Sequence, residues 1–579
     1  MTPAFAAGAA LFFAAEIEVY QPNPGLLALT YGHGTRAHGT LSLRPLALEA
    51  PGTIRASDTG YRTRADDPGG LRVYPPVLDT AFAIDRRVGL APGDASTRTY
   101  GSIRLSNLGE RFDAYTLSRN SDNRPARILI GAKAWDSARG YQVHPSYTDL
   151  LPLFGGVALP WLVEEEAVTI PLADPAAWLD RPVQDATYVG TGGLEGGADL
   201  AGKPKPMTRG GTLAAPVCDV PLVLVDAAAL IYQWTDGPGA VQTLYEGGQG
   251  GFTYDGDVAD LYAAGSPAPG HYRTNRARGL LRLGSKPVYT LSADVTGAFP
   301  SAAATLPGSV ALALLTEDMS LSPAVLDLPS FGAADVLRPY VVGYYVGTEP
   351  VQGAELLGNI LVSINARLIS TRSGLLSLFL LAPLPVGIRP EVALNPSNAV
   401  SVKPQALPAA LDPPPYRVQV SYATIWQTQS SGLNGAVSAA RRQELATADR
   451  YATAFSPLVR AQYRRPNDLA PTRTVLLQRT AAQAMASLVL ELFASRPGYY
   501  LVEVPIDAAA RIDIGTVVHV TWPLADLAVG RIGQVVGEQI RSDQASVTFL
   551  VLMSSQGGDA PISATAPLGI FTLGIHELA

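Results

Sequence analysis

The amino-acid sequence predicts a mainly β fold with a minor helical part, an α+β class, divided into several domains. Three observations carry this prediction. The chain has 579 residues, which at roughly 150 residues per domain gives about three or four domains. Its 56 glycines and 47 prolines imply frequent turns, which favour β-rich architecture over helical bundles. Short runs that alternate polar and apolar residues recur along the chain, as expected for strands with one buried face.

Composition narrows the possible functions. Hydrophobic residues make up 47% of the chain and charged residues 16%, so most of it should be folded. The net charge is −7 and no basic run is interleaved with aromatics, which disfavours specific nucleic-acid binding. An acidic wall would still let DNA slide past, because it repels phosphates.

Cysteine content and hydropathy indicate the cellular compartment in which the chain is made. Cys218 is the only cysteine, so one chain can hold neither an intramolecular disulfide nor a cysteine-based metal site. No run reaches the roughly 18 apolar residues of a membrane-spanning helix. The apolar stretch 5–15 lacks the basic flank of a signal peptide. We therefore expect a chain made in a cytoplasm, without a membrane anchor.

The first predicted domain, residues 1–185, is β-rich, and the family resemblance described below implies that it is a β-barrel. Residues 1–50 combine apolar bursts with a glycine-marked turn, and 50–70 are predicted to be a loop. From residue 71 the residue pattern is typical of β-strands, and Ser102–Ser106 alternates polar and apolar positions throughout. We expect strands at 80–84, 102–106, 127–131, 153–157 and 167–172.

The middle of the chain is predicted to form two domains. Residues 186–300 are β-rich, and residues 301–415 are mixed α+β, ending in a stiff proline-rich linker at 404–415. Ser330 is a candidate N-cap, because its hydroxyl can accept from the first free amides of a helix. We expect strands at 217–225, 280–283 and 288–291, helices at 309–315, 331–337 and 353–364, and a hairpin of 367–371 and 375–381 around Ser373-Gly374.

The last predicted domain, residues 416–579, is also β-rich, with a helix-containing excursion at 429–475 after a strand at 417–422, and the resemblance implies a second β-barrel. A helix follows, because apolar residues recur at helical spacing up to Phe493, and the Arg496-Pro497-Gly498 segment ends it. Met485, Leu488, Val489 and Leu492 share its apolar face. Four strands complete the domain, at 499–504, 513–521, 530–537 and 546–552.

The first and last predicted domains share a sequence pattern. Each has a glycine-led strand, a re-entrant strand associated with "GG" or "GRIG", and a terminal apolar strand. This pattern indicates a weak internal duplication.

Several of these segments carry a family resemblance. "RPGYYLVEVP", "IGTVVHVTWP", "GRIGQVVGEQ" and "VTFLVL" resemble the end of the central baseplate hub proteins of long-tailed phages and prophages. "GSIRLSNLGERFD", "RILIG", "LFGGVAL" and "VTIPLAD" resemble the first domain of that family and of distal tail proteins. "GKPKP" and "YQWTDGP" are similar to prophage tail proteins.

The resemblance implies a structural role in the virion. Two similar barrels per chain would let a homotrimer form a pseudo-six-fold ring that joins a six-fold tail tube to a three-fold tip. The implied partners are distal tail or tail tube proteins, the tape measure protein, and tip or fibre proteins, with DNA passing through the channel without specific binding. The implied location is the tail tip or baseplate, after assembly in the host cytoplasm.

Two loops resemble binding motifs in part. Gly197–Lys203 has the first seven positions of a phosphate-binding loop, but Pro204 stands where a magnesium-binding hydroxyl belongs, and no strand precedes it. Asp255, Asp257 and Asp260 begin like a calcium loop without its twelfth-position glutamate. A surface loop and a solvated acidic turn are the favoured interpretations.

The remaining candidates are also weak. Glu164-Glu165-Glu166 cannot supply a facing pair of catalytic carboxylates, because consecutive strand positions point to opposite faces. A charged edge or turn is the expected role. No G-x-S-x-G hydrolase elbow is present. The histidines show no metal-site spacing, and they are His33, His38, His144, His271, His519 and His576.

We therefore predict no enzyme activity and no catalytic, cofactor-binding or metal-binding residues. Two other functions stay open, because catalytic groups can lie far apart in a sequence. One is a tail-associated cell-wall or polysaccharide hydrolase, and the other is a host-receptor-binding tip module.

Overall fold

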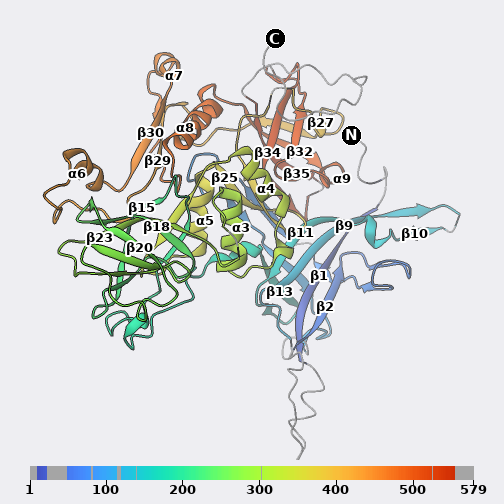
Figure 1. Cartoon of the computed structure of the whole chain (residues 1–579). Coiled ribbons are helices and arrows are strands. Elements are labelled where there is room, and N and C mark those ends of the chain that lie inside the picture. The colour runs from blue at the N-terminus through green and yellow to red at the C-terminus, as the bar shows by residue number, and fades with distance from the viewer. Residues whose placement is uncertain are drawn as a thin grey trace, which may run out of the picture.

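The computed structural model describes residues 5, 10–22, 49–79, 82–113, 119–138, 140–301, 303–385, 387–524, 526–544 and 546–554. The fold is mainly β, as predicted, and the helices at 307–313, 328–337 and 353–362 lie in the middle of the molecule, between the green strands and the blue and red strands (Figure 1). No helix in these ranges is long and apolar enough to cross a membrane.

The N-terminal sheet follows the order β2-β1-β9-β11-β13-β8-β5. Four predicted strands are confirmed within it, those at 102–106, 127–131, 153–157 and 167–172. The predicted loop at 50–70 is wrong, because Ile54 and Ala56 are buried in a strand that pairs along β1. Its elements are β1 (Ala10–Pro22), β2 (Glu49–Ser57), β5 (Leu78–Asp79), β8 (Ser102–Ser106), β9 (Arg124–Asp136), β10 (Tyr141–Val143), η1 (Tyr147–Asp149), β11 (Leu151–Ala158), β12 (Leu162–Val163) and β13 (Ala167–Ala173), beside the small pair β3 (Tyr61–Arg62) and β4 (Val73–Tyr74).

The C-terminal sheet follows the order β27-β33-β34-β35-β32-β28. The predicted helix and the four strands after it are confirmed, with the helix α8 at Arg479–Ala494. The sheet's strands are β27 (Val392–Leu394), β28 (Ser401–Pro404), β32 (Tyr499–Pro505), β33 (Val517–Val520), β34 (Arg531–Arg541) and β35 (Ser546–Met553), with the short helix α9 (Ile506–Ala509) after β32.

Six strands of each sheet lie in the same order once β2, at the end of the N-terminal sheet, is left aside. Numbered along the chain, the six strands β1, β5, β8, β9, β11 and β13 lie in the spatial order 1-4-5-6-3-2. The strands β27, β28, β32, β33, β34 and β35 lie in that same order. The first pairing differs, since β1 runs antiparallel to β9 whereas β27 runs parallel to β33. The shared strand order supports the duplication predicted from the sequence, which stays a prediction.

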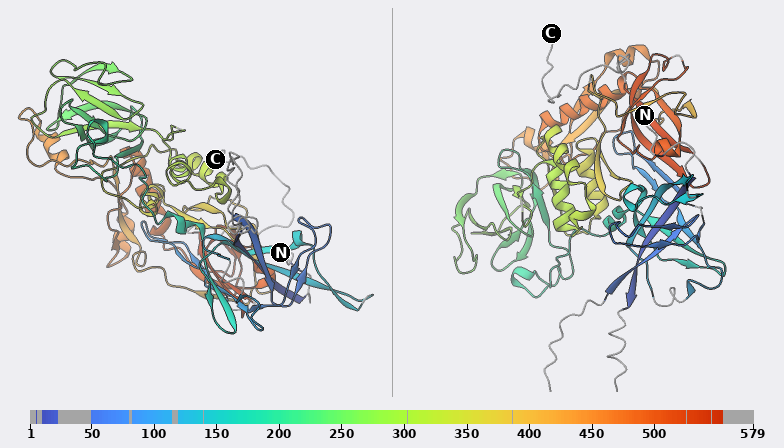
Figure 2. Two further views of the ribbon diagram at one scale, coloured as in Figure 1. Left: turned by 90° about the horizontal axis from the view of Figure 1, so that it is seen from below. Right: turned by 90° about the vertical axis from the view of Figure 1, so that its right-hand side faces the viewer.

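Neither sheet has a ladder between its end strands within the described residues, so they are open, barrel-like sheets. Figure 2 shows the red C-terminal sheet directly above the blue N-terminal sheet. Their inner faces form one continuous hydrophobic core, in which residues such as Ile103 and Phe154 are in the same cluster as Val502 and Phe549. The two duplicated sheets therefore fold as one unit.

The middle of the chain adds two further sheets, in the orders β19-β18-β23-β14-β24, with β15 beside β23, and β16-β17-β22-β21-β20. The predicted strand at 280–283 is confirmed, but the predicted strand at 288–291 begins only at Leu291. The strands are β14 (Met207–Gly210), β15 (Val217–Pro221), β16 (Val223–Asp226), β17 (Ile231–Gln233), β18 (Gly239–Glu246), β19 (Gln249–Gly250), β20 (Thr253–Asp257), β21 (His271–Asn275), β22 (Leu280–Leu283), β23 (Leu291–Gly297) and β24 (Gly343–Val346).

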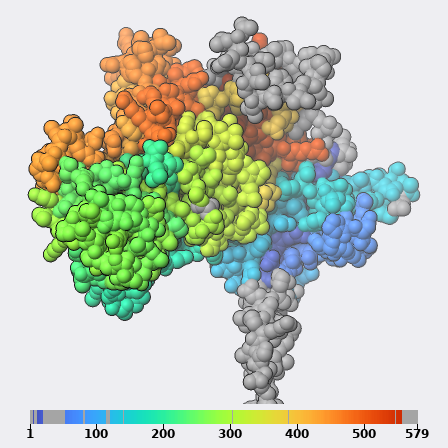
Figure 3. All heavy atoms as spheres, viewed as in Figure 1, coloured from blue at the N-terminus to red at the C-terminus, as the bar shows by residue number. Residues whose placement is uncertain are grey.

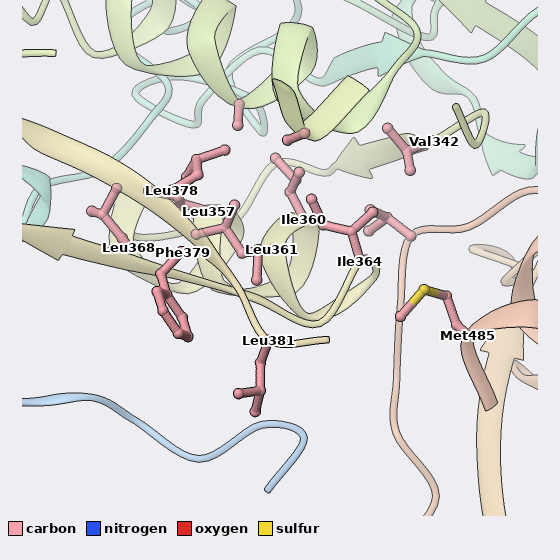
Figure 4. Close-up of a cluster of buried hydrophobic side chains, with 14 of the residues drawn as sticks. Val342, Leu357, Ile360, Leu361, Ile364, Leu368, Leu378, Phe379, Leu381 and Met485 are labelled. Atoms are coloured by element: carbon pink, nitrogen blue, oxygen red, sulfur yellow. The ribbon is translucent and has the colours of Figure 1, made fainter. Parts of the chain in front are cut away.

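A helical layer and a hairpin pack at the centre. The predicted N-cap Ser330 is wrong, because α4 begins two residues earlier, after Asp327, with Pro329 in its first turn. Leu357 and Ile360 of α5, Leu378 of the hairpin and Met485 of α8 share one core (Figure 4). The elements are η2 (Pro175–Leu179), η3 (Gly193–Glu195), α3 (Pro307–Ala313), the π-helical η4 (Leu314–Asp318), η5 (Pro323–Val325), α4 (Leu328–Leu337), α5 (Gly353–Val362), β25 (Ala366–Ser370) and β26 (Leu376–Leu380).

The excursion before α8 forms a three-stranded sheet in the order β30-β29-β31, and α8 packs against β29 and β30. The proline-rich stretch 404–415 lies against the core, since Leu407 and Leu411 are buried there. The four domain boundaries stay a prediction. The excursion's elements are β29 (Pro415–Tyr422), α6 (Ala439–Leu445), β30 (Arg450–Phe455), α7 (Pro457–Gln462) and β31 (Asn467–Asp468).

Candidate functional site

One strand of the N-terminal region belongs to the C-terminal sheet. The strand β6 (Ala83–Arg87) pairs antiparallel with β34 over five residues and also pairs with β7 (Thr97–Thr99). Of the predicted strand at 80–84, Thr80 and Ala81 lie outside the described residues. The two duplicated sheets are therefore joined by a backbone ladder as well as by a shared core.

A buried ion cluster occupies this ladder. Arg86 of β6 lies directly opposite Glu538 of β34, and the two residues are only 3% and 0% exposed. Arg86 Nε donates to Glu538 Oε1 over 2.8 Å. Arg372, from the turn between β25 and β26, donates from Nη2 to Glu538 Oε2 over 2.7 Å. One carboxylate thus binds two guanidinium groups from distant parts of the chain.

Asp513 completes the cluster and balances its charge. Its Oδ1 lies 2.6 Å from Arg86 Nη2, and its Oδ2 accepts from the backbone N–H of Arg372 over 2.9 Å. Two cations therefore face two anions, and such pairing is what makes buried charge tolerable. Burial opposes the charged forms of both Arg86 and Asp513, but the opposite charges outweigh it. They raise the pKa of Arg86 and lower the pKa of Asp513.

The hairpin β25–β26 links this cluster to the N-terminal sheet. While Arg372 reaches into the C-terminal sheet, the hairpin tip at Ser373-Gly374 lies against Gly155 of β11. A Cβ at Gly155 would lie 2.5 Å from the carbonyl carbon of Ser373, so only glycine allows this approach. Gly374 has a φ of +88°, which favours glycine at the tip as well.

The donors and acceptors of this junction are engaged with one another. The remaining guanidinium nitrogen of Arg86 donates to Ser370 O, and Arg372 Nη1 donates to Ala509 O over 3.0 Å. These contacts hold three segments of the chain in one relative orientation. We take this junction as the candidate functional site.

The segment that partly resembles a phosphate-binding loop lies in a loop in the structure. Gly197–Lys203 consists of turns, and the backbone carbonyl of Lys203 accepts from Tyr188 N. No helix follows Lys203, so the arrangement that binds phosphate at a helix N-terminus is missing from this segment. The surface-loop interpretation is confirmed.

The aspartates of the suspected calcium loop are not brought together around one point. Asp255 bonds His271 over 2.6 Å, Asp257 accepts from Thr274, and Asp260 accepts from the backbone of Tyr262. Among the described residues no group of three or more histidine, cysteine or acidic side chains could hold a metal ion.

The other sequence candidates have local roles. His144 stacks on Tyr61 and accepts from the backbone N–H of Arg62. His519 is buried in β33. Burial raises the pKa of the Cys218 thiol to about 12, so it stays protonated at neutral pH. His33, His38 and His576 lie outside the described residues.

The glutamate run is confirmed as a charged turn. Glu164-Glu165-Glu166 connects β12 to β13, and all three residues are exposed. The side chain of Glu164 is 63% exposed, with its ion pair to Arg104 at 4.0 Å.

Sequence inspection missed the junction residues, although a signal was present. Ile84 and Val88 are buried, and Arg86 lies midway between them in the sequence, so all three side chains belong to the same buried face. Glu538 stands between Val536 and Ile540 in the same way. A charged residue on the buried face of a strand needs a buried partner of opposite charge. Two such residues with opposite charges therefore predict a buried ion pair.

The chain matches no protein-family model and no curated protein. Solved structures to which it is similar include the following three. The tail protein of Neisseria meningitidis MC58 is 12% identical, with 85% of this chain and 96% of that chain covered and a TM-score of 0.32. The 43 kDa tail protein of prophage MuSo2 from Shewanella oneidensis is 9% identical, with 85% and 97% covered and a TM-score of 0.31. A chain of the virion of a native gene transfer agent particle is 12% identical, with 61% and 84% covered and a TM-score of 0.36.

Identities of this size do not specify a function. The function has to be argued from this chain's own residues.

Proposed function

We propose that this chain is a structural hub subunit of a phage or prophage tail. The observation that carries the proposal is the repeated strand order of the N-terminal and C-terminal sheets within one chain. A protein with two equivalent modules can present twice as many similar surfaces as it has copies.

Symmetry gives this duplication a use. A closed ring needs interfaces that repeat, and three copies of a duplicated chain offer six similar modules on a three-fold axis. Such a ring would match a six-fold tail tube on one side and a three-fold tip on the other. The homotrimer, the pseudo-six-fold ring and the barrel character of both modules are parts of this proposal.

The junction supports the proposal mechanically. A ring that transmits six-fold contacts needs its two modules fixed relative to each other. The β6–β34 ladder, the shared core and the Arg86–Glu538–Arg372 cluster provide that fixation. We therefore assign the junction a positioning role in assembly.

The proposed surroundings follow from the proposed role. The partners are distal tail or tail tube proteins, the tape measure protein, and tip or fibre proteins, and the location is the tail tip of the virion after assembly in the host cytoplasm. DNA would pass through the ring without specific binding, which the net charge of −7 supports.

One observation keeps the hydrolase alternative in view. A cleft of about 980 Å³ lies between the loop 92–101, η2 and α5, and Asp180 and Glu355 are among the carboxylates that line it. Lysis of host cell wall in a zymogram by the purified chain, lost in Asp180→Asn and Glu355→Gln, would favour that alternative. Saturable adsorption of the isolated chain to host cells would favour a receptor-binding module.

Immunogold labelling of tailed particles assembled with this chain tests the proposal. We expect gold only at the end of the tail that carries the tip. Labelling along the whole tube, on the fibres alone or nowhere on the particle would contradict a hub.

A further inference from the structure

The sheet of the excursion has one open face. In β30, Ala452 and Ala454 are buried on the side of α8, whereas Tyr451 and Phe455 are exposed, by 40% and 45%. Within the described residues β30 pairs with β29 alone, so it is an edge strand. Residues 450–465, the arginine lobe, project from the molecule at the upper left of Figures 1 and 3.

The arginine lobe combines apolar and basic groups. Leu458 of α7 is 78% exposed, and Arg464 and Arg465 are exposed beside it. The lobe contains four arginines and no carboxylate, in a chain whose net charge is −7. Exposed aromatic residues and arginines are the types enriched at protein–protein binding hot spots. The lobe therefore suits a partner surface that is apolar and acidic.

A surface of that kind exists on the chain itself. Leu162 and Val163 form the edge strand β12 and are 61% and 47% exposed. Glu164, Glu165 and Glu166 follow them directly and are exposed. Residues 162–166, the glutamate turn, thus place two apolar side chains beside three negative charges.

The arginine lobe and the glutamate turn cannot meet within one chain. Figure 1 shows α7 at the upper left and β13, which follows the glutamate turn, at the lower right of centre. A ring with cyclic three-fold symmetry needs two different, complementary surfaces on opposite sides of each subunit. These two surfaces meet that requirement in position, polarity and charge.

We infer that the arginine lobe of one subunit docks on the glutamate turn of a second copy of this chain. The inference rests on the proposed trimer and names the surfaces that close it. Apolar contact through Phe455, Leu458, Leu162 and Val163 supplies burial, and the arginines and glutamates fix the register.

DNA is a poorer fit to the arginine lobe. The Arg460 guanidinium already lies 5.5 Å from the ring centre of Tyr416 and 6.0 Å from that of Phe455. Single-stranded nucleic acid binds such surfaces by stacking bases on open aromatic faces. Rings covered by an arginine of the same chain favour a protein partner.

The test measures the mass of the purified full-length chain by sedimentation velocity at low and high salt. The wild type is expected to form trimers that weaken as ionic strength rises, because exposed charge pairs are screened. Arg460→Glu with Arg464→Glu and Arg465→Glu, the lobe variant, should raise the dissociation constant about 100-fold or more, since like charges then face each other. Arg62→Glu with Arg389→Glu and Arg511→Glu is the matched control on other exposed arginines and should leave the mass unchanged.

The reverse variant, Glu164→Arg with Glu165→Arg and Glu166→Arg, should lose trimers as well, and a chain that carries both sets of substitutions, so that the two charges are exchanged, should recover them. Near-wild-type circular dichroism shows that each variant folds. A wild type that stays monomeric at every concentration overturns the proposed trimer. A trimeric wild type with a trimeric lobe variant overturns only this docking, as does a failure of the charge-exchanged chain to recover trimers. A lobe variant that stays trimeric but no longer retards a duplex DNA probe would identify a DNA-facing surface instead.

Discussion

At the residue scale, the account depends on Glu538, whose carboxylate binds Arg86 and Arg372 in the interior. Desolvation makes a buried charge costly unless a partner of opposite charge compensates it, so the four groups of the cluster are coupled. Removing one anion leaves a buried cation without compensation. The cluster is therefore the place where a single substitution should separate the two duplicated sheets most effectively.

Replacing Glu538 with glutamine should destabilise the chain by about 3–5 kcal/mol, because two buried guanidinium groups lose their shared counter-charge. The control is Asp543→Asn, which removes the exposed pair with Arg541 and should leave the free energy of unfolding nearly unchanged, because solvent screens that pair. Urea unfolding followed by fluorescence compares the two. Equal losses for both variants would show that the cluster is not a joint.

The contribution of Asp513 to folding stability should depend on pH. Its pKa is lowered in the folded chain from the ordinary 3.8, so its contribution to stability is full above that value and is lost as the pH falls through the folded pKa. Asp513→Asn should therefore be less stable than the wild type at about pH 7, and the gap should close as the pH falls below about 4. Thermal melts at a series of pH values measure the gap. A gap that widens in acid would have the wrong sign.

At the element scale, sequence patterns located most strands and helices but not the links between them. The helix α8 and the strands β32 and β35 follow from local periodicity, which is a property of short segments. The strand β2 was missed because Gly52 and Pro51 mimic a loop, and its pairing with β1 overrides that local preference. The pairing of β6 with β34 joins residues about 450 positions apart, and no local signal encodes it.

The hairpin contact gives an element-scale prediction. Gly155→Ala should destabilise the chain by about 1–3 kcal/mol, because the added methyl group meets the backbone of Ser373 and pushes the hairpin off β11. Gly358→Ala in α5 is the matched control. Its Cβ meets open space, so it should stabilise the helix by up to about 1 kcal/mol. If the unfolding midpoints of both variants shift in the same direction, the result contradicts this role of Gly155.

At the scale of the whole molecule, the same strand order in two sheets is the feature with a functional consequence. The sequence contained a trace of it in the glycine-led strands of both ends, but six-strand topology cannot be derived from such a pattern. The ladder and the shared core then combine the two copies into one rigid subunit. Three such subunits would form a three-fold ring with six similar modules, and this ring would join the six-fold tail tube to the three-fold tip.

The most direct measurement of this claim is a single-particle electron-microscopy reconstruction of the purified oligomer, calculated without imposed symmetry. We predict three copies around an open channel, with six similar sheet modules at nearly equal angular spacing. A solitary monomer, or a ring in which the N-terminal and C-terminal sheets lie at unrelated radii, would contradict the account.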